Sequence, residues 1–261
     1  MREPRTVYYS DELNDDFAGT KIETRQIGAD YPYVRKNPLW SVAEAIMYRG
    51  FATPLVFLIG KLVYGLKIKN RRALRRLRKT GFYLYGNHTQ SFMDAAIPTL
   101  AAFPRKTYIV ANPDAVSIKG IVTLVQMFGG IPIPTSLKAL PVFRETLSRR
   151  VGQRRAVALY PESHIWPWYT GIRPFGDAAF AYPVRDGAPC VAFTTTYRRR
   201  KIFKNGKPLL TVTLSEPFYP DPSLPRQEAR GGLRDRVHAF MCETASAPGN
   251  YEYIKYIKKE D

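Results

Sequence analysis

The chain has 261 residues, which suits one domain of moderate size, and 45% of them are hydrophobic, which is ample for a buried core. Lys and Arg outnumber Asp and Glu by 40 to 22, so the formal net charge at pH 7 is +18. This charge favours a polyanionic partner: nucleic acid, an anionic membrane or a phosphate-rich ligand. Cys190 and Cys242 lie far apart in apolar stretches, which favours buried thiols over a disulfide or a nucleophile. No secretory signal is expected, because Met1 to Asp16 is polar and partly acidic.

Residues 38–66 are rich in apolar side chains at helical spacing, and Pro54 is expected to divide them into two helices. From Phe51 to Leu66 only Lys61 is charged. This run of about 16 residues is shorter than the roughly 20 that cross a bilayer. Two interpretations remain: a pair of core helices, or an anchor that lies in the membrane surface.

Basic residues favour the anchor. Residues 67–79 contain eight Lys and Arg, and a basic stretch beside an apolar helix matches an anionic membrane leaflet. Further basic residues gather at 198–201 and near the C-terminus, at 255–259. We therefore expect a peripheral protein on the cytoplasmic face of a membrane. The expected divisions are an N-terminal arm (1–37), an interfacial helical and basic segment (38–79), an α/β domain (80–246) and a basic C-terminal tail (247–261).

From residue 80 onwards, strand-like and helix-like patterns alternate. Strands are predicted at 82–86, 107–111, 156–160, 190–197 and 209–214, and helices at 91–102, 117–128, 138–152, 178–184 and 225–245. This alternation predicts an α/β fold with a mostly parallel central sheet flanked by helices, preceded by the apolar helix pair. Asn205-Gly206 has the turn chemistry of a hairpin and predicts an antiparallel strand near the C-terminal edge of the sheet.

The most informative segment follows the first of these strands. Gly86-Asn87 turns the chain and brings His88 to the strand exit, and Asp94 follows nearby in sequence. A carboxylate that fixes the tautomer of an imidazole makes the free ring nitrogen a general base. From this segment alone, a surface His in a loop is an equally good interpretation.

Three more blocks favour catalysis. These are Gly129-Gly130-Ile131-Pro132-Ile133-Pro134, then Tyr160-Pro161-Glu162-Ser163-His164, then Pro189-Cys190-Val191-Ala192-Phe193. In this order, over residues 80–220, the four blocks resemble the glycerolipid acyltransferases, which include 1-acylglycerol-3-phosphate and glycerol-3-phosphate acyltransferases. The resemblance implies direct acyl transfer in glycerolipid synthesis, from acyl-CoA or acyl-carrier protein to a glycerolipid or other alcohol, without a cofactor or metal. It implies that His88 is the base, that Asp94 orients it, and that Glu162, Ser163 and His164 line the acceptor site.

The chain departs from the family pattern in ways that concern the acceptor. Five residues separate His88 from Asp94, where the family has four, and Met93 stands at the family's Asp position. The third block lacks the family's Gly and Arg, and residues 134–136 lack the Arg of the second block. In the family these arginines hold a phosphate, so Arg144 and Arg173 are the candidate replacements. We expect an acceptor other than glycerol 3-phosphate itself.

Other classes of site fit the sequence less well. No His-Glu-x-x-His, Gly-x-Ser-x-Gly or phosphate-loop motif is present, which disfavours a zinc site, a serine hydrolase and a nucleotide phosphate loop. His238 lies in a helical stretch and is expected to be structural. The remaining alternatives are a non-catalytic lipid-binding relative and a basic nucleic-acid-binding protein, although we expect no nucleic-acid partner.

Overall fold

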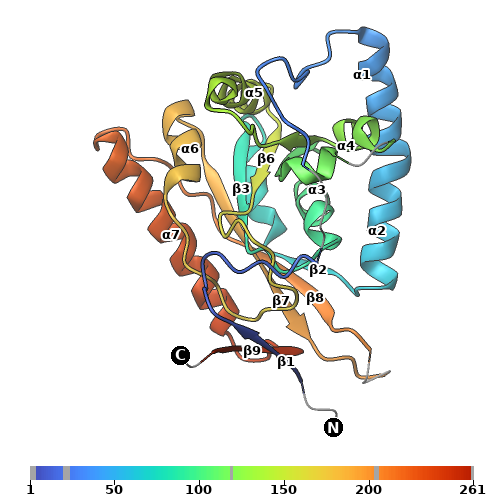
Figure 1. The fold of residues 1–261 in the computed structure, drawn as a ribbon, viewed down its shortest axis with the longest axis vertical. Helices are drawn as coiled ribbons and strands as arrows, with labels where there is room; N and C mark the ends of the chain where they lie inside the picture. Colours follow the sequence, from blue (N-terminus) through green and yellow to red (C-terminus); the bar gives the residue numbers. More distant parts are fainter. Residues whose placement is uncertain (1–3, 20–23, 118–119, 203–205, 260–261) are drawn as a thin grey trace.

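A central seven-stranded sheet carries the fold in the computed structural model, which describes residues 4–19, 24–117, 120–202 and 206–259 (Figure 1). In spatial order the strands are β2 (Lys67–Lys69), β8 (Leu209–Leu214), β7 (Cys190–Arg198), β3 (Phe82–Gly86), β6 (Ala156–Leu159), β4 (Thr107–Ala111) and β5 (Gly130–Pro132). Strands β3 to β7 are mutually parallel, whereas β8 is antiparallel to β7 and β2 is parallel to β8. The predicted mostly parallel α/β sheet is confirmed. The antiparallel β7–β8 pair is also as predicted, although Asn205 of its turn lies outside the described residues.

Helices cover both faces of the sheet. The α-helices are α1 (Pro38–Ala45), α2 (Thr53–Leu62), α3 (Ile97–Ala102), α4 (Val122–Met127), α5 (Leu140–Gly152), α6 (Ala181–Asp186) and α7 (Arg226–Ser246). Shorter helical turns are η2 (Arg71–Leu77), η3 (Met93–Ala95), η4 (Pro113–Val116), η5 (Leu137–Ala139) and η6 (Ala178–Phe180). Helix α3 packs on one face, while α5 and α7 pack on the other.

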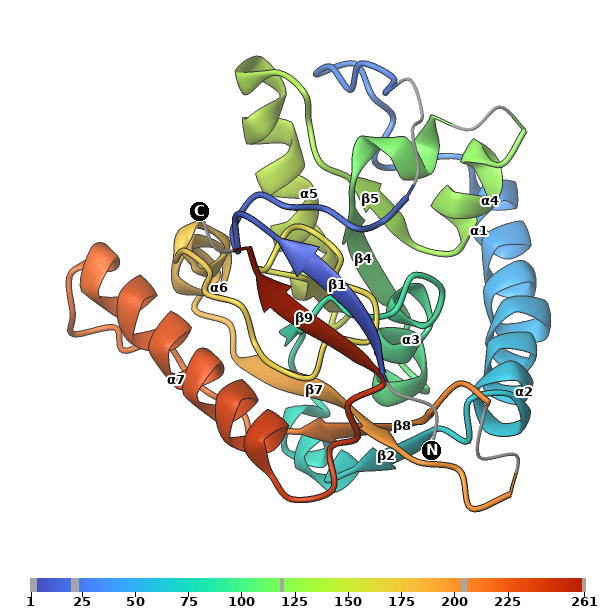
Figure 2. The same ribbon diagram turned by 60° about the horizontal axis from the view of Figure 1, so that its bottom comes forward.

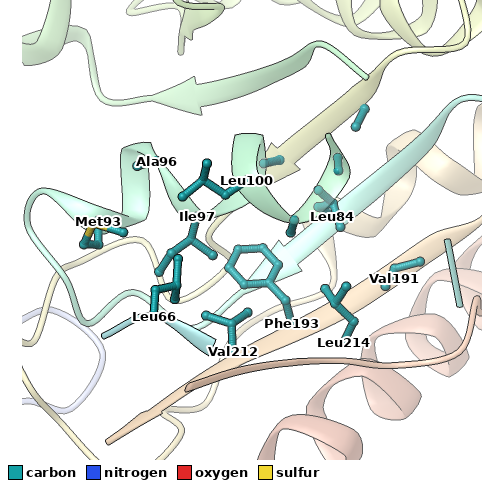
Figure 3. Close-up of a cluster of buried hydrophobic side chains, with 14 of the residues drawn as sticks. Leu66, Leu84, Met93, Ala96, Ile97, Leu100, Val191, Phe193, Val212 and Leu214 are labelled. Atoms are coloured by element: carbon teal, nitrogen blue, oxygen red, sulfur yellow. The ribbon is translucent and has the colours of Figure 1, made fainter. Parts of the chain in front are cut away.

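Strand β3 shows why the sheet sits in the middle of the molecule. Phe82 and Leu84 point to the α3 face, Tyr83 and Tyr85 point to the α5 and α7 face, and all four are buried. Figure 3 shows Leu84 packed with Ile97, Leu100 and Phe193 on the first face. Two buried faces explain why this strand reads as a continuous apolar run.

The apolar segment at residues 38–62 differs in two ways from the expected N-terminal pair of helices. Residues 38–62 form one continuous helix, and strand β1 precedes it. Between α1 and α2, the π-helical segment η1 (Ile46–Ala52) shifts the bonding pattern, so that the Thr53 N–H donates to the Tyr48 carbonyl. Pro54 then falls in the first turn of α2, where its missing N–H does not interrupt the helix. The expected break at Pro54 is therefore wrong.

The expected N-terminal arm and C-terminal tail meet in a second, two-stranded sheet. Strand β1 (Arg5–Tyr9) pairs in parallel with β9 (Ile254–Lys258), as Figure 2 shows. From these two strands, the side chains of Tyr9 and Tyr256 pack on the buried indole of Trp166, with ring centroids 4.7 and 4.9 Å away. The two ends of the chain thus cover the loop that follows β6.

Candidate active site

The candidate site lies at the edge of the sheet where the parallel strands end, called here the carboxyl edge. Strand β3 exits there through Asn87, whose buried side chain continues the pairing between β3 and β7. Its amide donates to the Thr195 carbonyl at 3.0 Å and its carbonyl oxygen accepts from the Thr195 N–H at 2.7 Å. This double hydrogen bond fixes the backbone immediately before His88.

His88 and Asp94 are in contact. The Nδ1 atom of His88 lies 2.7 Å from Oδ2 of Asp94, which also accepts a hydrogen bond from the Gln90 N–H at 2.8 Å. The expected irregular helix start between Thr89 and Met93 is confirmed, because regular helix begins only at Ile97, after the short turn η3. This late start absorbs the extra residue before Asp94 and preserves the dyad.

The imidazole of His88 is held in place but accessible. Its side chain is 25% exposed, and its ring stacks on Tyr160 with centroids 4.7 Å apart. The Tyr160 hydroxyl donates to the Asp94 carbonyl, and burial raises the pKa of Tyr160 well above its usual value, so it remains a donor. The Nε2 atom of His88 makes no hydrogen bond with the described part of the chain, and it is therefore the nitrogen available to a substrate.

Asp94 is a buried carboxyl group. Burial raises its pKa, whereas the hydrogen bonds from His88 and from the Gln90 N–H favour the ionised form. Its other oxygen, Oδ1, has no hydrogen-bond partner within the described chain. An aspartate placed in this way stabilises an imidazolium on His88 more strongly than a solvated carboxylate would.

Glu162 joins the two loops of the site. Its Oε2 accepts from the His88 N–H at 3.0 Å, and its Oε1 accepts from the Arg173 N–H at 3.2 Å. Burial raises the pKa of this carboxyl group, and the nearby Arg173 guanidinium opposes that rise. The loop after β6 is attached further by two backbone bonds, from Trp166 N–H to His88 O at 3.1 Å and from Trp168 N–H to Thr89 O at 2.9 Å.

Neither candidate arginine is placed as a free phosphate ligand. The Arg173 side chain is 1% exposed, and its guanidinium donates to the carbonyls of Glu162 and His164 and lies 3.6 Å from the Glu162 carboxylate. Arg144 lies on the exposed face of α5, near Arg185 of α6. The structure therefore brings Arg173 to Glu162 as a buried structural cation, and it does not bring Arg144 to His88.

Ser163 and His164 lie at the outer side of the site. Ser163 is exposed and has φ 64°, a left-handed conformation that favours glycine. The His164 side chain is 39% exposed, with Nδ1 3.7 Å from Oδ2 of Asp16. Sequence reasoning missed Asn87 and Tyr160 as site residues, although both lie in the blocks that it singled out.

No cluster of metal ligands accompanies this site. Across residues 4–19, 24–117, 120–202 and 206–259, no three His, Cys, Asp or Glu side chains are grouped so that they could hold a metal ion. The acidic and imidazole groups present are instead used in pairs, His88 with Asp94 and Glu162 with Arg173.

Comparison with known proteins supports the fold. No family model and no curated protein matches the chain. Among solved structures, it is similar to the crystal structure of the 1-acyl-sn-glycerophosphate (LPA) acyltransferase PlsC from Thermotoga maritima, with a TM-score of 0.56 and 16% identity, over 84% of this chain and 92% of that one. At this identity the similarity establishes a shared fold, a mostly parallel sheet flanked by helices.

Proposed function

We propose that this protein transfers an acyl group from a thioester to an alcohol at a membrane surface, as part of lipid synthesis. The observation that carries the proposal is the 2.7 Å contact between His88 and Asp94, with the other imidazole nitrogen unbonded and reachable. The shared fold with the PlsC acyltransferase supports it. The donor is a thioester of coenzyme A or of acyl-carrier protein.

The chemistry needs only one base. The acceptor hydroxyl oxygen attacks the thioester carbonyl carbon while Nε2 of His88 takes the hydroxyl proton. The carbon–sulfur bond then breaks, the acyl group remains on the acceptor oxygen as an ester, and the imidazolium returns the proton to the leaving thiolate. Asp94 holds Nδ1–H and stabilises the imidazolium, while Glu162 holds the backbone of His88.

The helix at residues 38–62 supports a membrane location. Eight apolar side chains of this helix, and Val63 directly after it, are more than half exposed; the eight are Leu39, Val42, Ile46, Phe51, Leu55, Phe57, Leu58 and Leu62. In length and composition this helix is sufficient to cross a membrane. We propose that it lies in the membrane surface instead, because Glu44 pairs with Lys106 and the Tyr48 hydroxyl bonds to Thr99 and Thr107, which ties the helix along the α/β domain.

The acceptor is proposed to be an alcohol other than glycerol 3-phosphate. The guanidinium of Arg173 already pairs with Glu162 and loop carbonyls, and Arg144 lies apart from His88. A phosphate dianion would therefore find neither of these two arginines ready to compensate its charge. His164, at the outer side of the site, is a candidate to contact the acceptor.

The test is a thioester-consumption assay on the full chain with vesicles and a panel of alcohols: glycerol phosphate, lysolipids and uncharged alcohols. We expect turnover by the wild type and a loss of at least about 10³-fold in His88→Ala. The matched control is His238→Gln, since His238 lies on α7 beside Phe175 and Cys242. Normal turnover by a folded His88→Ala protein would refute the mechanism.

A further inference from the structure

A basic groove opens at the end of β7. Its volume is about 590 Å³, and its lining consists of Lys67, the Arg198–Lys201 run, Ile202 and Leu209. These residues lie where β2 and β8 begin and β7 ends. Because β7 is parallel to β3 and Gly86 pairs with Phe193, β7 leaves the sheet on the same side as His88 and continues past that carboxyl edge to Arg198.

One residue of β7 joins the groove to the catalytic loop. Tyr197, which precedes Arg198, places its hydroxyl 2.7 Å from the Thr89 hydroxyl and 3.1 Å from Nε2 of Gln90. Thr89 and Gln90 directly follow His88 in the chain. Tyr197 therefore connects the end of β7, which lines the groove, to the segment of backbone that directly follows His88.

Two arginines of the groove, Arg198 and Arg200, are held by hydrogen bonds to neutral groups. The Arg198 guanidinium donates to the carbonyls of Gly65 and Leu210, at 2.7 and 3.2 Å, and to the Thr211 hydroxyl. The Arg200 guanidinium donates to the carbonyls of Lys207 and Val63. Arg199 aside, none of the cations of the groove has a carboxylate within ion-pair distance in the described part of the chain. Fixed, uncompensated guanidinium groups are suited to phosphate oxygens.

The volume and lining of the groove indicate the ligand. Sites for small molecules commonly have volumes of about 300–1,000 Å³ and combine apolar walls with a few polar groups. Here Ile202 and Leu209 supply apolar surface, and the basic residues supply enough charge for several phosphate groups. A single lipid phosphate would leave most of that charge uncompensated, whereas a ligand with several phosphate groups, such as coenzyme A, would compensate it.

We propose that this groove binds the phosphorylated nucleotide end of a coenzyme A thioester, with its 3′-phosphate and diphosphate on the basic residues and its pantetheine arm directed to His88. This assignment rests on the proposed acyl transfer and names its donor. Coenzyme A rather than acyl-carrier protein is then the carrier of the acyl group.

The first experiment measures binding, which needs no turnover. Coenzyme A and adenosine 3′,5′-bisphosphate are titrated calorimetrically into the full chain. We expect the double variant Lys67→Glu/Lys201→Glu to weaken both affinities at least about tenfold, because both side chains are exposed and their loss leaves the fold intact. The matched control, Lys138→Glu/Lys255→Glu, makes the same change in net charge at exposed sites elsewhere and should bind as the wild type does. Equal affinities in the two double variants would overturn the proposal.

The second experiment distinguishes a role of the groove in binding the donor from a role in the chemical step. With acyl-CoA, the KM of Lys67→Glu/Lys201→Glu should rise about tenfold while kcat stays within twofold; with acyl-pantetheine, which lacks the nucleotide, both should be unchanged. Turnover of acyl-CoA with an unaltered KM would leave the proposed acyl transfer intact but refute the binding of coenzyme A in the groove. Nucleotide binding that depends on Lys67 and Lys201, without any thioester turnover, would uphold the groove and refute the acyl transfer. If the variant lost only anionic-vesicle binding or only acyl-carrier-protein turnover, the groove would belong to that partner and the assignment would fall.

Discussion

The carboxylate of Glu162 accepts a hydrogen bond from the backbone N–H of His88 at 3.0 Å, across 74 residues of sequence. The same carboxylate accepts from the Arg173 N–H, so one side chain fixes the loops after β3 and after β6. Glu162 touches the backbone of the base rather than its ring. It is therefore a positioning residue for the proposed reaction.

This role predicts a particular behaviour for Glu162→Gln. The amide keeps the shape of the side chain but removes the charge that pairs with Arg173 and weakens the bond to His88. We expect kcat to fall about 10–100-fold, with a small change in KM, because the imidazole loses its fixed position. The steady-state constants of the variant test this. A purely structural role would instead lower the free energy of unfolding and leave kcat per folded molecule unchanged.

Asp94→Asn tests the orientation of the base. An asparagine amide offers Nδ1 a donor as readily as an acceptor, so the tautomer with hydrogen on Nε2 is favoured, and the imidazolium loses its carboxylate. We expect kcat to fall about 10²–10⁴-fold with a similar KM. The control is Asp16→Asn, because Asp16 lies near His164 rather than His88. Near-normal turnover in Asp94→Asn would mean that another group orients His88.

Arg173→Ala separates stability from acceptor binding. Arg173 and Glu162 form a buried pair, and removal of one partner leaves an uncompensated buried charge. We expect the free energy of unfolding to fall by about 3–5 kcal/mol. Arg144→Ala should change stability by less than about 0.5 kcal/mol and leave acceptor preference unchanged, because Arg144 is exposed and apart from the site. Denaturant titrations and the acceptor panel test both statements. If Arg144→Ala abolished a preference for phosphate-bearing acceptors, the position of Arg144 would have to be reinterpreted.

The fold was largely predictable where side chains alternate between two buried faces. Strands β3, β4 and β8 begin and end at the predicted residues, because each is an apolar run bounded by turns; β3 is buried throughout, and β4 and β8 are buried in part. The β1–β9 pair could not be predicted in this way. Its two strands come from opposite ends of the chain, and their residues are exposed or only partly buried, as Arg5 and Ile254 are, so neither strand carries a strong pattern of its own.

The site was predictable where residue type alone carries chemistry. His88, Asp94 and Glu162 are rare or charged residues in the segments that follow β3 and β6, and the structure brings them together. Asn87 was missed because its importance lies in the geometry of two hydrogen bonds to Thr195, which no local pattern reveals. Arg144 was chosen for its charge and its place in the chain, but charge gives no information about which way a helix face points.

The exposed face of the 38–62 helix predicts how the protein binds membranes. We expect Leu55→Glu/Leu58→Glu to reduce binding to vesicles at least about tenfold without loss of stability, because both side chains are more than half exposed. The control is Leu13→Glu, which changes a similarly exposed leucine in the N-terminal segment. Wild-type binding should weaken with salt on anionic vesicles, since basic residues contribute. Co-sedimentation over a range of salt measures both effects. If the double variant bound vesicles as the wild type does, the helix would not be part of the surface that contacts the membrane.

Lys106 provides a test of the packing of that helix that depends on pH. Its ammonium group is buried between the rings of Tyr48 and Tyr108 and pairs with Glu44. Burial lowers the pKa of Lys106 from 10.5 to about 8, and the pairing with Glu44 opposes this shift. Between these two values the unfolded chain binds more protons than the folded chain. This group therefore makes the free energy of unfolding rise with pH, by up to about 3 kcal/mol over the window.

The measurement is urea unfolding at several pH values from 8 to 9, where tyrosines in the unfolded chain, with a pKa of about 10, are still mostly protonated. The wild type should gain stability with pH more steeply than Lys106→Met, by up to about 1.4 kcal/mol per pH unit. Lys138→Met, which removes an exposed lysine, should keep the wild-type slope. Parallel slopes for the wild type and Lys106→Met would mean that the pairing with Glu44 fully compensates the burial. The helix would then be held to the sheet by an ion pair that stays charged throughout this range.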